Sequence, residues 1–202
     1  MATTTDTDTE LSAVNSILGA IGQSPVTTIN YENPEISFIY NILTEVNKYV
    51  QNEGWHFNTE YHVTTTPDAN GYVNLPTNTL RYDLNEDEHD KSQDIVVRSG
   101  RLYDLVDHTD VFTSDLYLDL VTLYAFSDLP NPFQRYITHR ASVRAATQLV
   151  SNPQLVQLLQ QQEGQARSVC MEYECNQGDH SFFGWDHHST YHAYQPYKAL
   201  QR

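Results

Sequence analysis

The sequence predicts an α+β fold, in which an antiparallel helical bundle carries an inserted antiparallel β-rich lobe and a C-terminal extended arm. Apolar residues recur at helical spacing near both ends of the chain. Short runs of β-branched and aromatic residues, separated by turn residues, fill the middle of the chain. In the last stretch the apolar residues recur at no regular spacing. These changes divide the chain into a first bundle half at 1–54, a β-rich lobe at 55–128, a second bundle half at 129–176 and an aromatic arm at 177–202.

Two helices are expected in the first bundle half. The first ends at Gly22, and either Thr7 or Thr9 has the spacing of a capping residue at its start. The second begins at Asn33-Pro34, where a cap residue precedes a proline at the first helical position, and it ends at Gly54. The apolar stripes of the two helices are Leu11, Val14, Ile17, Leu18 and Ile21, and then Ile36, Ile39, Tyr40, Leu43, Val46 and Val50.

The central segment is expected to form antiparallel strands, because its connections are too short for the crossovers that parallel strands need. Ser99-Gly100 lies between two strand-like runs and predicts a hairpin turn. Trp55 and Phe57, where the second helix meets this segment, are expected to anchor the core. The expected strands are 61–66, 72–75, 94–98, 101–105 and 116–124.

Two further helices are expected in the second bundle half. In the first of them one face is formed by residues four apart, and the small ones among them permit close approach of a neighbouring helix. Asn152-Pro153 repeats the cap-and-proline start and begins the last helix. The two stripes are Ile137, Ala141, Ala145 and Leu149, and then Leu155, Leu158, Leu159, Ala166, Val169, Cys170 and Tyr173.

The charge balance is strongly acidic. Eleven lysines and arginines oppose 26 aspartates and glutamates, for a formal net charge of −15. Tight non-specific binding to duplex DNA is therefore disfavoured, because such affinity comes largely from cations placed on phosphates. An acidic wall remains compatible with a channel through which DNA slides without sticking.

Sequence features also indicate the compartment. Cys170 and Cys175, five residues apart on one expected helix, point about 140° away from each other, so we interpret them as reduced thiols. No apolar run approaches the ~20 residues that span a bilayer. The N-terminus lacks the basic and apolar regions of a secretory signal, so the chain is expected to fold in a cytoplasm, with no membrane partner.

Several stretches, in order along the chain, share the pattern of one known family. They are Glu10-Leu11-Ser12-Ala13-Val14-Asn15 with Ile17-Leu18, Ile21-Gly22 and Pro25-Val26, then Gly54-Trp55-His56-Phe57-Asn58, Arg98-Ser99-Gly100-Arg101-Leu102-Tyr103-Asp104, Ala166-Arg167 and Cys170-Met171-Glu172-Tyr173-Glu174. They resemble the tail tubular protein A family, the adaptor proteins of short-tailed bacteriophages (podoviruses). The resemblance implies a structural virion protein of the tail or neck, with no cofactor and no catalytic residues.

The resemblance also implies partners. A homo-oligomeric ring, dodecameric in this family, is expected beneath the portal protein and above the tail nozzle protein, with tail fibres at its periphery. DNA would pass through the ring during genome ejection without tight binding. Rings need two different faces that close head to tail, and a bundle with a lateral β lobe supplies them.

Two groups of residues are candidates for partner binding. The aromatic arm is expected to become ordered on assembly, by docking on the portal or an adjacent subunit. Arg140 and Arg144 share a helix face, and either they line a DNA channel or they pair with carboxylates of a neighbouring subunit. We favour subunit pairing because of the net charge and because arginine makes bidentate contacts with carboxylates. The arm residues concerned are Phe182, Phe183, Trp185, Tyr191, Tyr194 and Tyr197.

Other chemistries have weak support. The acidic run that starts at Asp83 has glutamate where a calcium loop needs glycine, and the spacing of the C-terminal histidines His180, His187, His188 and His192 fits no zinc pattern. We therefore predict no metal. A virion-associated glycan (cell-wall) hydrolase, with two carboxylates across a sugar, and a monomeric binding module remain the alternative classes of function.

Overall fold

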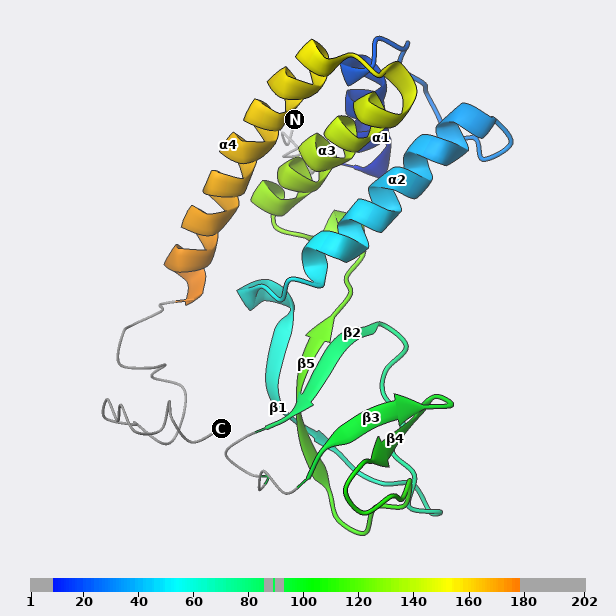
Figure 1. The fold of residues 1–202 in the computed structure, drawn as a ribbon, viewed down its shortest axis with the longest axis vertical. Helices are drawn as coiled ribbons and strands as arrows, with labels where there is room; N and C mark the ends of the chain where they lie inside the picture. The colour runs from blue at the N-terminus through cyan, green and yellow to red at the C-terminus, as the bar shows by residue number, and fades with distance from the viewer. Residues whose placement is uncertain (1–8, 86–88, 90–92, 179–202) are drawn as a thin grey trace, which may run out of the picture.

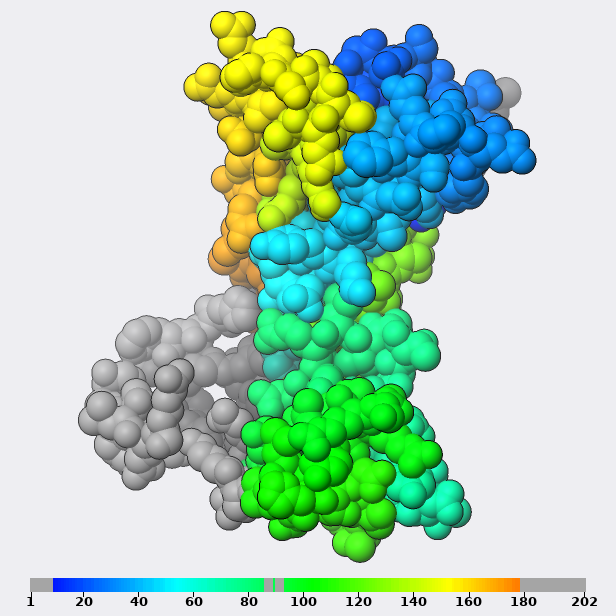
Figure 2. Space-filling view, turned by 45° about the vertical axis from the view of Figure 1, so that its right-hand side comes forward, coloured from blue at the N-terminus to red at the C-terminus, as the bar shows by residue number. Residues whose placement is uncertain are grey.

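The computed structural model describes residues 9–85, 89 and 93–178. The molecule is elongated, with a helical bundle at one end and a β lobe at the other, and a narrower waist joins them (Figures 1 and 2). The β lobe is inserted between the second and third helices, so both ends of the described chain belong to the bundle. The predicted α+β class is confirmed. The predicted arm lies outside the described residues apart from its first two positions, which continue the last helix.

The first two helices begin at the caps that the sequence offers. Helix α1 spans Glu10–Ala20, and of its two candidate caps the structure uses Thr9, whose hydroxyl accepts a hydrogen bond from the backbone N–H of Ser12 (3.2 Å). Gly22 follows with a φ of +81°, which suits glycine because it has no Cβ. Helix α2 spans Pro34–Gln51 and is capped by Asn33.

Two helices and a π-turn form the second half of the bundle. Helix α3 spans Asn131–Ala145 and widens into the π-turn η3 at Ala146–Val150, and α4 spans Pro153–Gly178. The stripe predicted on α3 is buried as far as Ala145, but Leu149 is 46% exposed. The prediction for Leu149 is wrong because the π-turn adds a residue to the turn and rotates this position away from the core.

Helix α3 is the centre of the bundle, since α1, α2 and α4 all pack against it. The apolar core between them holds both predicted anchors of the junction: Trp55 is 5% exposed, and Phe57 packs against the core from a partly buried position. Their rings meet Phe133 of α3 with centroids 4.9 and 4.7 Å away. The bundle is thus one core built from both halves of the chain.

Helix α4 has α3 as its main neighbour and buries a narrow stripe. Leu159 and Cys170 are buried, whereas Leu158 and Val169 are 59% and 51% exposed. The predicted α4 stripe is therefore wrong at Leu158 and Val169, because contact with a single helix covers less of the circumference than the apolar positions occupy.

The β lobe consists of two antiparallel layers. A three-stranded sheet has the order β1-β5-β2, formed by Thr59–Thr65, Leu116–Thr122 and Thr79–Leu84. The second layer is the predicted hairpin of β3 (Ile95–Arg98) and β4 (Arg101–Asp104), which turns at Ser99 and Gly100. A second apolar core lies between the layers, formed by Val73, Leu102, Phe112, Leu116, Leu118 and Leu120.

Two strand assignments differ from the prediction. Residues 72–75 do not form a strand, although the carbonyl of Val73 accepts a hydrogen bond from the N–H of Leu102 (2.9 Å). Pro76 follows at once and cannot donate to a ladder, which limits pairing there. Strand β2 was not predicted, and its alternating Leu80, Tyr82 and Leu84 were the available signal. No helix in the described part of the chain is long and apolar enough to cross a membrane.

Candidate functional site

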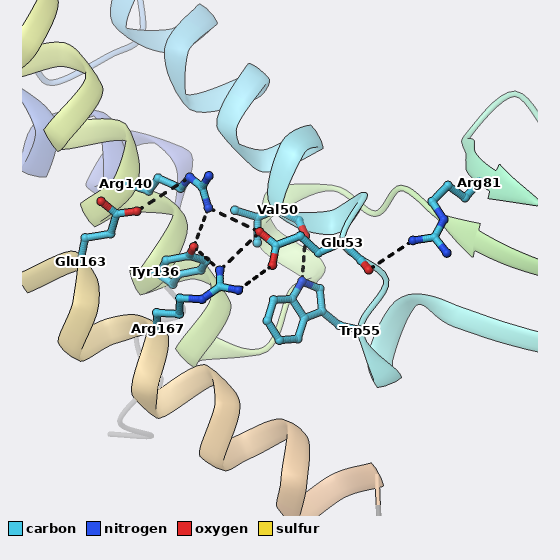
Figure 3. Close-up of polar contacts among 8 residues, drawn as sticks. All are labelled: Val50, Glu53, Trp55, Arg81, Tyr136, Arg140, Glu163 and Arg167. Carbon is cyan, nitrogen blue, oxygen red and sulfur yellow. Dashed lines mark hydrogen bonds and ion pairs between the residues drawn. The ribbon is translucent and has the colours of Figure 1, made fainter. Parts of the chain in front are cut away.

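A network of polar contacts lies at the waist between bundle and lobe, with Glu53 near its centre (Figure 3). Glu53 lies just after α2, and its carboxylate faces Arg167 of α4 and Arg140 of α3. Arg167 makes two contacts, with Nη2–Oε2 at 3.1 Å and Nη1–Oε1 at 3.4 Å, and Arg140 Nη1 lies 3.4 Å from Oε1. One carboxylate thereby joins three helices.

The two guanidinium groups also share a phenol oxygen. Tyr136 is fully buried, and its Oη accepts a hydrogen bond from Arg140 (2.6 Å) and another from Arg167 (2.7 Å). The hydrogen bond to Glu53 and then that to Tyr136 raise the pKa of Arg167. Burial lowers the pKa of Arg140, but Tyr136, Glu163 and Glu53 together outweigh it, and the pKa is raised. Both arginines are therefore permanently charged and held in place.

Backbone contacts extend the cluster to the β lobe. Arg81 of β2 reaches the carbonyl of Glu53 (3.4 Å), and the indole N–H of Trp55 donates to the carbonyl of Val50 (2.7 Å). The side chain of Gln51, fully buried, both donates to and accepts from the backbone of Tyr124 (2.9 and 2.8 Å). These bonds fix the lobe to the end of α2. These contacts join the bundle to the β lobe. Among the residues that make them, no nucleophilic side chain lies beside a general base.

A second feature is the outer face of α4. Between Pro153 and Ala166 the only charged residue is Glu163, in a chain of net charge −15. Leu158 is exposed on this face together with a set of neutral glutamines. Covering such a face costs less hydration energy than covering charged side chains, because a neutral amide is less costly to bury than an ion. The exposed glutamines are Gln154, Gln157, Gln160, Gln161, Gln162 and Gln165.

A groove of about 500 Å³ runs between α1 and α4, with α3 as its floor. Its walls are mostly small residues, and Arg135 and His139 of α3 also line it. Burial, and then the nearby positive charge of Arg135, lower the pKa of His139, against an opposing effect of Glu163. The small lining residues are Ser12, Ala13, Ser16, Ala20, Thr138 and Ser142.

Within the described residues, no three histidine, cysteine or acidic side chains are grouped so that they could hold a metal ion. Both cysteines are free, as predicted: Cys170 is buried and Cys175 is exposed. The four C-terminal histidines and most of the acidic run lie outside the residues that the structure describes.

The sequence matches a known family over most of its length. The model of the family described as "Tail tubular protein" matches residues 11–180. The chain belongs to the tail tubular protein family. It is also similar to tail tubular protein A of Klebsiella phage KP34, with 36% identity over 123 residues, which is 60% of this chain and 62% of that relative. The predicted resemblance is confirmed, and the chain is a structural component of a phage tail rather than an enzyme.

Of the residues predicted to bind partners of this tail tubular protein, the structure describes the two arginines but not the six aromatic residues of the arm. Arg140 belongs to the Glu53 cluster and also lies 3.8 Å from Glu163, and Arg144 pairs with Glu45 of α2. Both arginines thus have partners in their own chain, and pairing with another subunit stays a prediction. The six aromatic arm residues, Phe182, Phe183, Trp185, Tyr191, Tyr194 and Tyr197, lie outside the described residues.

Proposed function

We propose that this chain is the adaptor subunit of the tail, a homo-oligomeric ring, dodecameric as in the family it resembles, that joins the portal protein to the tail nozzle protein around the DNA exit channel. The observation that carries the proposal is the nearly uncharged outer face of α4 in a chain of net charge −15. Copies of such an acidic chain repel one another, so a stable ring needs contact faces with little charge or with complementary charge.

The shape of the subunit supports a bridging role. The bundle and the β lobe are at opposite ends of an elongated molecule, and the Glu53 cluster fixes the waist between them (Figures 1 and 3). A subunit with two different ends can contact the portal protein at one end and the nozzle protein at the other. The tail fibres would then attach at the periphery of the ring. Acidic walls would let DNA pass without tight binding.

In this proposal the arm and the two arginines of α3 make contacts with neighbouring proteins. The arm at 177–202 would dock on the portal or on the adjacent subunit, and a chain truncated after Gln177 would then fail to assemble on portals. Arg140 and Arg144 have donors beyond those used within the chain, since a guanidinium carries five N–H groups. They would use these donors on carboxylates of a neighbouring subunit.

The test is the mass of the purified protein in solution, measured with and without portal protein. A discrete oligomer well above the 23.2 kDa of one chain, with a ring shape in electron micrographs, is expected. A monomer that closes into a ring only on portal would also support the proposal. A strict monomer that ignores portal would overturn it, and would return attention to a monomeric binding module.

A further inference from the structure

Two arginines are paired on one outer face of the β lobe, and two aspartates are paired on the other. Side chains alternate along a strand, and Leu118 and Leu120 of β5 point into the core between the layers, as Leu102 of the hairpin does from the other side. Residues of the opposite parity therefore point outward, away from that core. On the hairpin they include Arg98 and Arg101, and on the three-stranded sheet they include Asp83 and Asp119.

The hairpin face places like charges side by side. Arg98 and Arg101 are directly opposite each other in the last pair before the turn, and both are exposed. Like charges in this position destabilise a strand pair. Each guanidinium lies over a tyrosine ring, Arg98 over Tyr103 (4.1 Å to the ring centroid) and Arg101 over Tyr72 (3.8 Å), and a contact with a ring face does not use up the N–H donors of the guanidinium.

The two arginines differ in how far the described residues neutralise them. Arg101 Nη1 lies 3.8 Å from a carboxylate oxygen of Asp110, and its charge adds to the backbone hydrogen bonds that lower the pKa of Asp68, so it has two carboxylates nearby. Arg98 has no carboxylate within ion-pair distance among the described residues. By contrast, Arg140, Arg144 and Arg167 all have carboxylate partners. In a chain of net charge −15, Arg98 is thus a cation to which the described residues offer no carboxylate at ion-pair distance.

The opposite face of the lobe repeats the arrangement with anions. Asp83 of β2 and Asp119 of β5 are directly paired, and Asp83 is exposed. Asp119 accepts hydrogen bonds from the backbone of His62 and the side chain of Asn85 (both 2.9 Å), which hold its carboxylate in place. Arg81 shares this side of β2, but its guanidinium is engaged by the carbonyl of Glu53 at the waist.

We propose that the β lobe is a subunit contact of the ring, in which the Arg98–Arg101 face of one copy binds the Asp83–Asp119 face of the next copy. The inference rests on the proposed ring. The two faces lie on opposite sides of the lobe, so the same contact repeats from copy to copy, which is the head-to-tail geometry that closes a ring. Within one chain each pair brings like charges together, which is unfavourable. Between chains the arginine pair of one copy would face the aspartate pair of the next, which is favourable.

The test reverses one charge on each face. Arg98→Glu is expected to raise the protein concentration at which rings form by about tenfold, the effect of losing one close charge pair. Asp83→Lys should do the same. An equimolar mixture of the two variants should restore ring formation, because the introduced glutamate would then meet the introduced lysine, while Arg98 meets Asp83 at the alternate contacts. Lys48→Glu, which makes the same charge change as Arg98→Glu at an exposed position of α2, is the control and should assemble like wild type.

Each outcome separates the two proposals. If the wild-type chain forms no ring with or without portal, the adaptor role itself fails. If the wild type forms rings and Arg98→Glu assembles at the same concentration as Lys48→Glu, the ring stands and the β-lobe contact is wrong. The contact is also wrong if the mixture does not recover, provided that both variants show the wild-type circular dichroism and melting temperature. Normal assembly of Arg98→Glu with weaker retention of duplex DNA would place this face on DNA instead.

Discussion

Glu53 and Arg167, 114 positions apart in the sequence, are joined at two points between their carboxylate and guanidinium groups (3.1 and 3.4 Å). The pair connects the end of α2, where the chain enters the β lobe, to the last helix. Arg140 binds the same carboxylate, so two cations share the Glu53 anion, and Arg140 also lies 3.8 Å from Glu163. This cluster fixes the end of α2, from which the chain enters the β lobe, to α3 and α4.

Removing the charge of Glu53 should destabilise the chain. Glu53→Gln leaves Arg140 and Arg167 close together on Tyr136 with no anion between them. Because the charged groups are partly exposed and screened, we expect a loss of about 2 kcal/mol of unfolding free energy, or about 4–8 °C in Tm. Thermal melts followed by circular dichroism measure it.

Glu45→Gln is the matched control, since it removes the carboxylate that pairs with Arg144 on the surface. With side-chain exposures of 60% and 43%, that pair should contribute less than about 1 kcal/mol. Equal shifts for Glu45→Gln and Glu53→Gln would mean that the Glu53 carboxylate contributes no more than an exposed ion pair.

Two glycine substitutions should have opposite effects. Gly71 has a φ of +82°, and a Cβ there would lie 2.6 Å from a methyl of Val111 and 3.1 Å from the carbonyl of Phe112. Gly71→Ala should therefore cost about 2–3 kcal/mol, or about 5–10 °C in Tm. Gly164 lies within α4 with open space around it, so Gly164→Ala should stabilise by about 1 kcal/mol. A stable Gly71→Ala variant would show that this loop is not held as the structure has it.

The two thiols should differ sharply in reactivity. Burial raises the pKa of Cys170 to about 12, and its Sγ lies 3.2 Å from the carbonyl of Pro132. Cys175 is exposed on the same helix. At pH 8 a thiol reagent such as DTNB should modify one cysteine quickly and the second only after denaturation, because the thiolate is the reactive form. Cys175→Ser should abolish the fast phase, and a fast phase that survives it would place Cys170 at the surface.

The local signals of the sequence predicted most of the fold, and the exceptions have physical causes. Caps and prolines located the helix starts at Asn33 and Asn152, because these signals act within one turn. The exposure of Leu149 and Leu158 was not predictable in this way, because it depends on a π-turn and on how many helices surround α4. The spacing of apolar residues shows which side of a helix is apolar, but it does not show which neighbouring element covers that side.

The Glu53 cluster was largely beyond prediction from the sequence. Tyr136 and Arg140 are four residues apart on a helix, which is a local signal for their contact. The contacts of Glu53 with Arg140 and Arg167 cross from α2 to α3 and α4 and exist only in the folded bundle. The opposed Arg98 and Arg101, in contrast, follow directly from the predicted hairpin turn.

His139 should make the stability of the chain depend on pH. Burial and the charge of Arg135 lower its pKa in the folded state, so below about pH 6.5 the unfolded chain binds more protons than the folded one. Its contribution to stability is therefore complete above about pH 6.5 and is lost as the pH falls toward and through the folded pKa. The wild type should lose more unfolding free energy between pH 8 and pH 5 than His139→Gln does, as measured by urea melts. The carboxylates titrate in both chains, so the difference between the two curves isolates His139. Parallel curves would mean that the imidazole is as easily protonated in the groove as in the unfolded chain.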